Sequence, residues 1–129
     1  MNQERIRADI GQGYVQTRTV PLPHLLIVGT GSGSADTFYT VRADTLLKVT
    51  QLAAINITAG AVTLSFNAIP SGGAIGDGNA ELRAVSIPAN TAASLTNYIG
   101  GLYEGGATLK AYASATNSIV IHGWAEEIR

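Results

Sequence analysis

The glycine-rich stretch after residue 28 is the first segment whose composition could serve a ligand. An apolar run over residues 25–28 leads into Gly29, Gly31 and Gly33, and glycines placed after a strand can cradle a nucleotide phosphate. The spacing is G-x-G-x-G instead of G-x-G-x-x-G, and residues 34–47 have a strand-like pattern where a phosphate site needs the start of a helix. The stretch is therefore interpreted as a loop between strands.

The two histidines and a pair of glutamates are the other candidates for catalysis. His24 follows a proline, and His122 lies inside an alternating segment with no aspartate near it in the sequence. Neither therefore has the carboxylate partner that a catalytic triad requires. Glu126 and Glu127 are adjacent, so in a strand they point to opposite faces and cannot work as an acid–base pair. The sequence predicts no catalytic residue and no enzyme activity.

Three oxygen-bearing side chains occupy alternate positions of a second glycine-rich segment. Asp77, Asn79 and Glu81 could supply oxygen ligands to Ca²⁺. The segment lacks the twelve-residue pattern of a dedicated calcium loop, and Asp-Gly and Asn are ordinary turn formers. We interpret the segment as a turn and expect no metal or other cofactor, with calcium binding as the alternative.

Composition narrows the class of protein further. The chain has 129 residues, which suits one domain, and its net charge of −1 offers no electrostatic footprint for nucleic acid. It has no cysteine, which excludes disulfides and thiolate zinc sites, and no apolar run reaches the length of a membrane span. Only 13% of the residues are charged. Such a surface is either covered by neighbouring molecules or solvated by Thr, Ser, Asn and Gly.

From residue 24 onward the sequence alternates between apolar and polar residues, with turn formers at intervals. The expected strands are 24–28, 37–42, 46–57, 61–68, 82–87, 91–99, 107–115 and 119–128. In the third of them, the period of two assigns one face to Leu47, Val49, Ala53, Ile55 and Ile57. About eight short strands without crossover helices predict an all-β fold, an antiparallel, jelly-roll-like β-sandwich over residues 24–129.

Residues 1–23 differ from the rest of the chain. Charged residues gather near the start, glycines follow, and Pro21 and Pro23 favour extended backbone. The segment is predicted to be an extended N-terminal docking arm. Its expected contacts with a partner are the apolar and basic side chains Arg5, Ile6, Arg7, Ile10, Tyr14 and Val15.

The last two expected strands suggest a hairpin with a turn at residues 116–118. In that register Tyr112 lies beside His122 and Lys110 lies beside Trp124 on one face. A sheet whose two faces are both apolar is usually covered on both. In a chain of one domain, the second cover has to come from the arm or from another subunit. We therefore predict an oligomer interface formed by Lys110, Tyr112, His122 and Trp124.

Several segments resemble a family of small β-sandwich virion structural proteins of tailed bacteriophages. The segment Thr40–Thr45 resembles the family's TVPAGT opening, and Gly76–Ala80 with Val85–Thr91 resembles its GDGNAL…VSIPANT stretch. Leu102–Ala115 resembles its L.AGDTLYAYASA segment, and Val120–Trp124 its closing V.V.ISG.E strand. The chain departs from the pattern at Arg42, where the family usually has proline, and at the Glu-Gly-Gly of residues 104–106, which replaces a Gly-Asp turn.

The resemblance implies a non-enzymatic part of a virion, often trimeric. The expected function is capsid decoration, in which the protein acts as a cement subunit on the outer surface of the head and its partners are the major capsid protein or other virion proteins. A tail or neck accessory, or adhesin-base component, is the alternative, and a host-glycan-binding module is a second alternative. No nucleic acid or membrane partner is expected.

Overall fold

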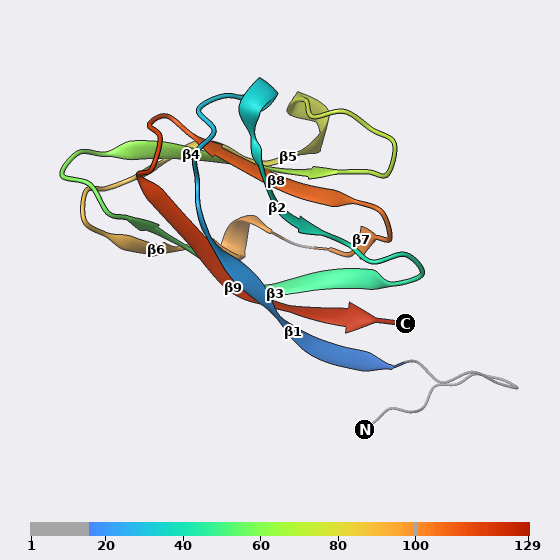
Figure 1. The fold of residues 1–129 in the computed structure, drawn as a ribbon. Helices are drawn as coiled ribbons and strands as arrows, with labels where there is room; N and C mark the ends of the chain where they lie inside the picture. The colour runs from blue at the N-terminus through green and yellow to red at the C-terminus, as the bar shows by residue number, and fades with distance from the viewer. Residues whose placement is uncertain (1–15, 100) are drawn as a thin grey trace, which may run out of the picture.

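The computed structural model describes residues 16–99 and 101–129, which form two antiparallel β-sheets packed face to face (Figure 1). Within these residues there are nine strands and three short 3₁₀ turns, η1 (Ser32–Ser34), η2 (Asp77–Asn79) and η3 (Thr96–Tyr98). The predicted all-β sandwich is confirmed. The part of the chain that the structure describes holds no helix of the length and apolarity that a membrane crossing requires.

The nine strands divide into two sheets. Sheet A has the order β1-β9-β3-β6, with β7 also paired to β3, and sheet B has the order β2-β8-β4-β5. The strands of sheet A are β1 (Thr17–Leu26), β3 (Leu46–Asn56), β6 (Ala92–Ser94), β7 (Tyr103–Glu104) and β9 (Ile119–Ile128). Those of sheet B are β2 (Asp36–Thr40), β4 (Val62–Ile69), β5 (Ala80–Ile87) and β8 (Thr108–Ala113).

The strand pairing is that of a jelly roll. The pairs β1–β9, β2–β8, β3–β6 and β4–β5 are those of one long antiparallel ribbon folded back at the β4–β5 turn. Rolling the ribbon places alternate pairs in opposite sheets, and the β9–β3 and β8–β4 pairings close each sheet. Successive strands therefore alternate between sheets over most of the chain.

The core lies between the sheets and is filled by alternate residues of the strands. Phe38 of β2 and Phe66 of β4 meet edge to face, with ring centroids 6.1 Å apart. Leu47, Leu109 and Ile121 are fully buried from β3, β8 and β9. Burial of these side chains is the main stabilising contribution to the sandwich.

The expected face of β3 is correct for its first half and wrong for its second. Leu47 and Val49 are buried, but a register shift against β9 lies between Val49 and Gln51. A β-bulge adds one residue and reverses which side chains point inward. Leu52 and Ala54 therefore enter the core, and the outward positions fall to Ala53, Ile55 and, past the strand's end, Ile57.

The predicted boundary between arm and sandwich at residues 23/24 is too late. Strand β1 begins at Thr17, and its first residues pair with the last residues of β9, as in Thr17↔Ile128. Pro21 and Pro23 lie within this strand, which is tolerated because β1 is an edge strand of sheet A. The predicted arm contacts Arg5, Ile6, Arg7, Ile10, Tyr14 and Val15 lie outside the described residues.

Candidate functional site

The outer face of sheet A carries a band of apolar and aromatic side chains. Leu26 of β1 and Ile55 of β3 are both register partners of Val120 in β9. Two residues further along β9, His122 is the partner of Ala53. Next along the strand, Trp124 pairs with Pro21. We call this set, together with His24, the sheet A band.

The histidines of the band stack on each other. The rings of His24 and His122 have centroids 4.6 Å apart and are inclined by only 4°. The register shift in β1 between Leu22 and Leu25 brings His24 opposite His122. Within the described residues neither ring makes an ion pair or hydrogen bond, and no group of three His, Cys, Asp or Glu side chains is arranged to hold a metal ion.

Large apolar side chains of the band are open to solvent. Trp124 is 46% exposed and Leu26 is 41% exposed, while Val28 and Ile57, just past the ends of β1 and β3, are about half exposed. Exposed apolar side chains on one face of a small domain are typical of interaction surfaces. The prolines of β1 oppose pairing of a further strand at this edge of sheet A.

A groove runs beside the band on the β6 side. It has a volume of about 280 Å³. Its lining residues are Gln51, Leu52, Ala53, Ala92, Ala93, Ser94, His122 and Gly123. At Gly123 the backbones of β9 and β3 come so close that a Cβ atom would lie 2.0 Å from the carbonyl oxygen of Gln51. Only glycine fits this position without movement of a strand.

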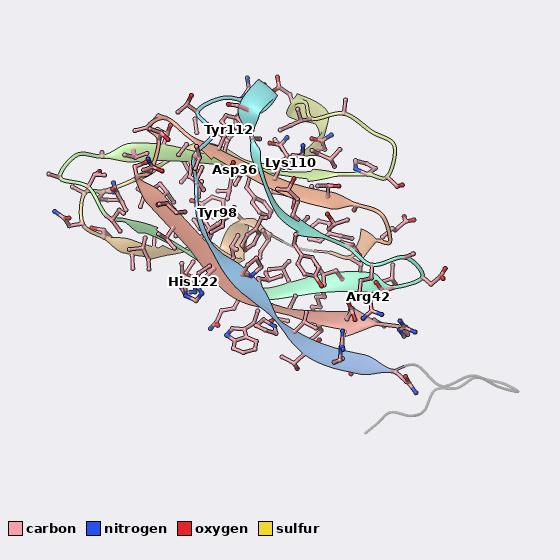
Figure 2. The ribbon with its side chains drawn as sticks, in the orientation of Figure 1. Asp36, Arg42, Tyr98, Lys110, Tyr112 and His122 are labelled. Carbon is pink, nitrogen blue, oxygen red and sulfur yellow. The ribbon has the colours of Figure 1, made fainter. Side chains whose placement is uncertain are left out.

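The predicted interface of Lys110, Tyr112, His122 and Trp124 is not assembled as one surface. Strand β8 pairs with β2 and β4 in sheet B, whereas β9 pairs with β1 and β3 in sheet A. The connection at residues 114–118 crosses between the sheets instead of closing a hairpin. Lys110 and Tyr112 therefore lie on the outer face of sheet B and His122 on sheet A (Figure 2). His122 and Trp124 do share a face, and His24 takes the place expected for Tyr112.

The outer face of sheet B is polar and is bonded internally. The amide of Asn67, buried at 3% exposure, donates to the carbonyl of Gly76 and to Oδ1 of Asn79. The hydroxyl of Ser65 accepts the backbone N–H of Ala84 at 3.0 Å. These bonds use the polar groups that a partner would otherwise need to satisfy.

The candidate calcium ligands turn toward separate partners. Asn79 holds the loop through Asn67 and also donates to the carbonyl of Ala74. Asp77 forms an exposed ion pair with Arg83 at 3.4 Å. Glu81 accepts a hydrogen bond from the hydroxyl of Tyr103 at 2.9 Å. In the structure the segment is the 3₁₀ turn η2 followed by β5.

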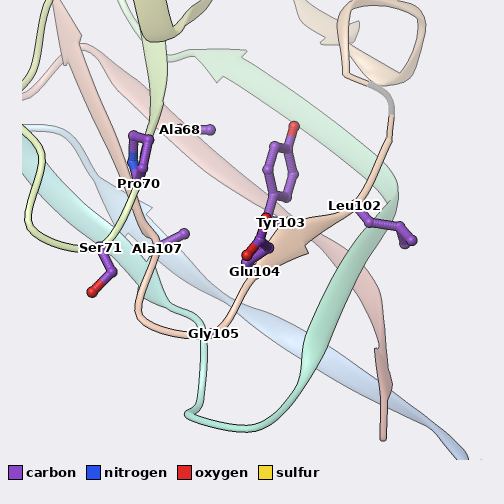
Figure 3. A pocket seen from close by; sticks show the side chains of 8 residues that line it. All are labelled: Ala68, Pro70, Ser71, Leu102, Tyr103, Glu104, Gly105 and Ala107. Atoms are coloured by element: carbon purple, nitrogen blue, oxygen red, sulfur yellow. The ribbon is translucent and has the colours of Figure 1, made fainter.

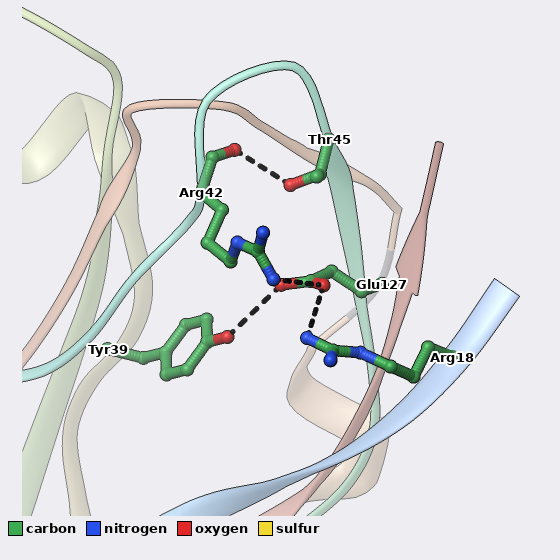
Figure 4. A network of polar contacts seen from close by, with 5 residues as sticks. All are labelled: Arg18, Tyr39, Arg42, Thr45 and Glu127. Carbon is green, nitrogen blue, oxygen red and sulfur yellow. Dashed lines mark hydrogen bonds and ion pairs between the residues drawn. The ribbon is translucent and has the colours of Figure 1, made fainter.

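A buried carboxylate lies at the open end of the sandwich. Glu127, 4% exposed, accepts hydrogen bonds at Oε1 from Arg18 at 2.9 Å and from Arg42 at 3.4 Å. The hydroxyl of Tyr39 donates to Oε2 at 3.5 Å, and Figure 4 shows the three side chains converging on Glu127. Burial, and then the charge of Glu127, raises the pKa of Tyr39 above its usual value. As expected, the neighbouring Glu126 points to the other face of β9.

A second hollow surrounds Tyr103 at the edge of the sandwich. It has a volume of about 320 Å³, and Figure 3 shows the side chains gathered around it. Its lining residues are Ala68, Pro70, Ser71, Leu102, Tyr103, Glu104, Gly105 and Ala107. The Tyr103 hydroxyl is already bonded to Glu81, and burial together with that bond raises the pKa of Tyr103 well above its usual value.

The glycine-rich loop after residue 28 binds its own backbone. The carboxylate of Asp36 accepts the backbone N–H groups of Val28 and Gly29, at 2.5 and 3.0 Å. A Cβ atom at Gly29 would lie 2.0 Å from the carbonyl oxygen of Ser34, so this glycine serves a close backbone contact. The interpretation as an inter-strand loop is confirmed.

The Glu127 cluster and the histidine stack have no signal in the sequence. Arg18, Arg42 and Glu127 are far apart along the chain, and only the jelly-roll pairing brings them together. The two histidines are 98 residues apart and meet only because β1 and β9 are neighbours. No protein-family model matches this sequence, and no curated protein matches it.

Proposed function

We propose that this protein is a non-enzymatic structural subunit of a tailed-phage virion, and that it acts as a capsid decoration protein on the outer surface of the head. The observation that carries the proposal is the sheet A band, an exposed apolar and aromatic surface on a small jelly roll with few charges. Such a surface suits permanent contact with a neighbouring protein. The sequence resemblance over Thr40–Thr45 and Val85–Thr91 supports a virion as the setting.

Trp124 is the proposed anchor of the contact. Tryptophan is enriched among residues that dominate binding energy, because its large side chain buries much apolar area. Leu26 and Val120 extend the apolar area along the band, and the His24–His122 stack lies between them and Trp124. The neighbour is the major capsid protein or, in a homotrimer, a second copy of the chain.

A cement subunit stabilises a shell through linked equilibria. If it binds the assembled lattice and not the unassembled coat protein, each bound copy shifts the equilibrium toward the intact shell. Trimerisation would strengthen attachment, because the second and third contacts form at high effective concentration. The N-terminal segment is proposed to add a contact with the coat through residues such as Arg5, Ile6 and Tyr14. Removal of residues 1–15 leaves β1 complete and tests that contact separately.

Copy number on purified particles tests the proposal. We expect a stained gel of virions to show the chain in hundreds of copies, at a fixed ratio to the coat protein. We also expect the isolated protein to co-sediment with tailless heads. A few copies per particle without binding to heads would identify a tail or neck accessory instead. Saturable binding to host surface glycan, without binding to particles, would identify a glycan-binding module.

A further inference from the structure

At the open end of the sandwich, arginine side chains outnumber the one acidic side chain that is paired with them, Glu127. A cavity of about 270 Å³ lies there. Its lining residues are Gln16, Thr17, Arg18, Arg42, Glu127 and Arg129. The described residues include six Lys and Arg side chains, and three of them line this one cavity against a single acidic side chain, that of Glu127.

The internal ion pairs use only part of the available donors. Arg18 and Arg42 both bond the same oxygen of Glu127, Oε1, and a guanidinium group has five N–H donors. Arg129 forms no ion pair with any residue in 16–99 or 101–129. Both paired guanidinium groups remain half-exposed or more, so their other N–H groups can reach a ligand.

The cavity is also held in shape before any ligand arrives. Buried Glu127 fixes two guanidinium groups from opposite sides (Figure 4). The hydroxyl of Thr45 donates to the carbonyl of Arg42 at 2.7 Å, which restrains the β2–β3 turn. Paired backbone hydrogen bonds between Gln16 and Arg129 close the far side. A site arranged in advance loses less entropy when it binds.

We propose that this cavity binds a carboxylate side chain presented by a neighbouring protein chain. The planar fork of a guanidinium group matches a carboxylate. A nucleic acid would need a longer run of cations, and the chain carries a net charge of −1. Inorganic phosphate is the competing occupant of the cavity, because a guanidinium group also pairs with phosphate, and the test below separates the two. This inference deepens the proposed function, on which the identity of the neighbour rests.

The test uses the whole protein and two synthetic peptides, acetyl-Gly-Glu-Glu-Gly-amide and the same peptide with glutamine. Binding is followed by nuclear magnetic resonance through the Nε–H signals of the arginines. We expect saturable shifts at Arg42 and Arg129 with the glutamate peptide and none with the glutamine peptide. Arg129→Gln should weaken binding about fivefold or more. Arg83→Gln, which removes one equal charge from a distant exposed pair, should change it less than about twofold.

Three outcomes would overturn the inference. They are equal binding of both peptides, equal losses in the Arg129 and Arg83 variants, and binding of inorganic phosphate without binding of the glutamate peptide. Arg129 is chosen because its side chain makes no described ion pair, so its loss leaves the Glu127 cluster intact. The peptide assay needs no virion, so failure here is distinguishable from failure of particle attachment.

Discussion

The outer faces of the two sheets differ although both belong to one small sandwich. On sheet A, Trp124 and Leu26 stand exposed and the His24–His122 stack lies between them. On sheet B, Ser65 and Asn67 are buried, and their polar groups form hydrogen bonds within the protein. A face whose polar groups are already hydrogen-bonded within the protein needs no partner to satisfy them. An exposed apolar face, in contrast, lowers its free energy when a partner covers it. This difference is the reason why we propose sheet A, and not sheet B, as the face that contacts a partner.

The largest expected effect on binding is the loss of attachment to particles, and it contrasts the two faces directly. Trp124→Asp places a charge at the Trp124 end of the sheet A band, and desolvating that charge opposes docking. We expect the affinity for particles to fall at least about thirtyfold, the equivalent of about 2 kcal/mol. Tyr112→Asp on sheet B should leave it nearly unchanged. Co-sedimentation with particles at a series of protein concentrations measures both, after circular dichroism has shown both variants folded. A greater loss from Tyr112→Asp would reverse the assignment of the adhesive face.

The largest expected effect on the stability of the fold comes from the ion pairs, which differ between the two sheets. Replacing both Arg18 and Arg42 with methionine removes both ion pairs of the buried Glu127 carboxylate and leaves it only the hydrogen bond from Tyr39, at an expected cost of about 3–5 kcal/mol. Adding Glu127→Gln to that double variant should restore most of the loss. Arg83→Met breaks only the exposed pair with Asp77 on the sheet B side and should cost less than about 1 kcal/mol. Urea unfolding midpoints at neutral pH give all of these values. Failure of Glu127→Gln to rescue the double variant would mean that the arginines stabilise by packing instead of by charge.

Backbone spacing provides a third contrast. Gly123→Ala should destabilise the protein by about 2 kcal/mol or more, because the added methyl group overlaps the carbonyl oxygen of Gln51 across the β9–β3 pair. Gly78→Ala, in the turn next to sheet B, places its methyl group in open space and should change stability by about 0.5 kcal/mol or less. Thermal unfolding followed by circular dichroism separates the two. Equal small effects would show that β3 can shift away from β9 at little cost.

The sequence was sufficient for the fold class because period two and turn residues are local signals. Most strands, such as β4 (Val62–Ile69), lie within a few residues of their expected ranges. The bulge at Val49/Gln51 and the pairing of β9 with β1 and β3 depend on long-range packing, which local alternation does not encode. Of the four side chains predicted to share one face, only His122 and Trp124 therefore do so, on sheet A. His122 and Trp124 alternate within one strand, whereas the hairpin that was to bring Lys110 beside them does not form.

A smaller effect on stability is expected from the hydrogen bond that links the edges of the two sheets. The hydroxyl of Tyr103 in β7 of sheet A donates to Glu81 in β5 of sheet B. Tyr103→Phe should cost about 1 kcal/mol near neutral pH. Because the pKa of Tyr103 is raised in the folded state, its contribution is fully present below the unfolded value of about 10 and is lost as pH rises above it. The gap between wild type and Tyr103→Phe should therefore narrow between about pH 10 and 11 in urea titrations. Tyr98→Phe serves as a control, since the Tyr98 hydroxyl bonds no described residue, and a gap that widens above pH 10 would contradict the link.

The smallest expected effect is a gain in stability on sheet B. Among residues 16–99 and 101–129, four non-glycine residues have positive φ, and Ala84, at 50°, is the only one of these that is not Asn or Asp. It lies where β5 bulges against β4, and its N–H is held by the Ser65 hydroxyl. An alanine in the left-handed region costs about 1 kcal/mol that glycine does not, and the extra chain entropy of glycine offsets part of the difference. Ala84→Gly should therefore raise the free energy of unfolding by about 0.5 kcal/mol. Asn117→Gly, at 56°, should be nearly neutral because asparagine tolerates this conformation. No gain at Ala84, or a loss, would mean that the bulge holds the alanine at this φ without strain. Equal gains at the two positions would mean that the strain is no greater for alanine than for asparagine.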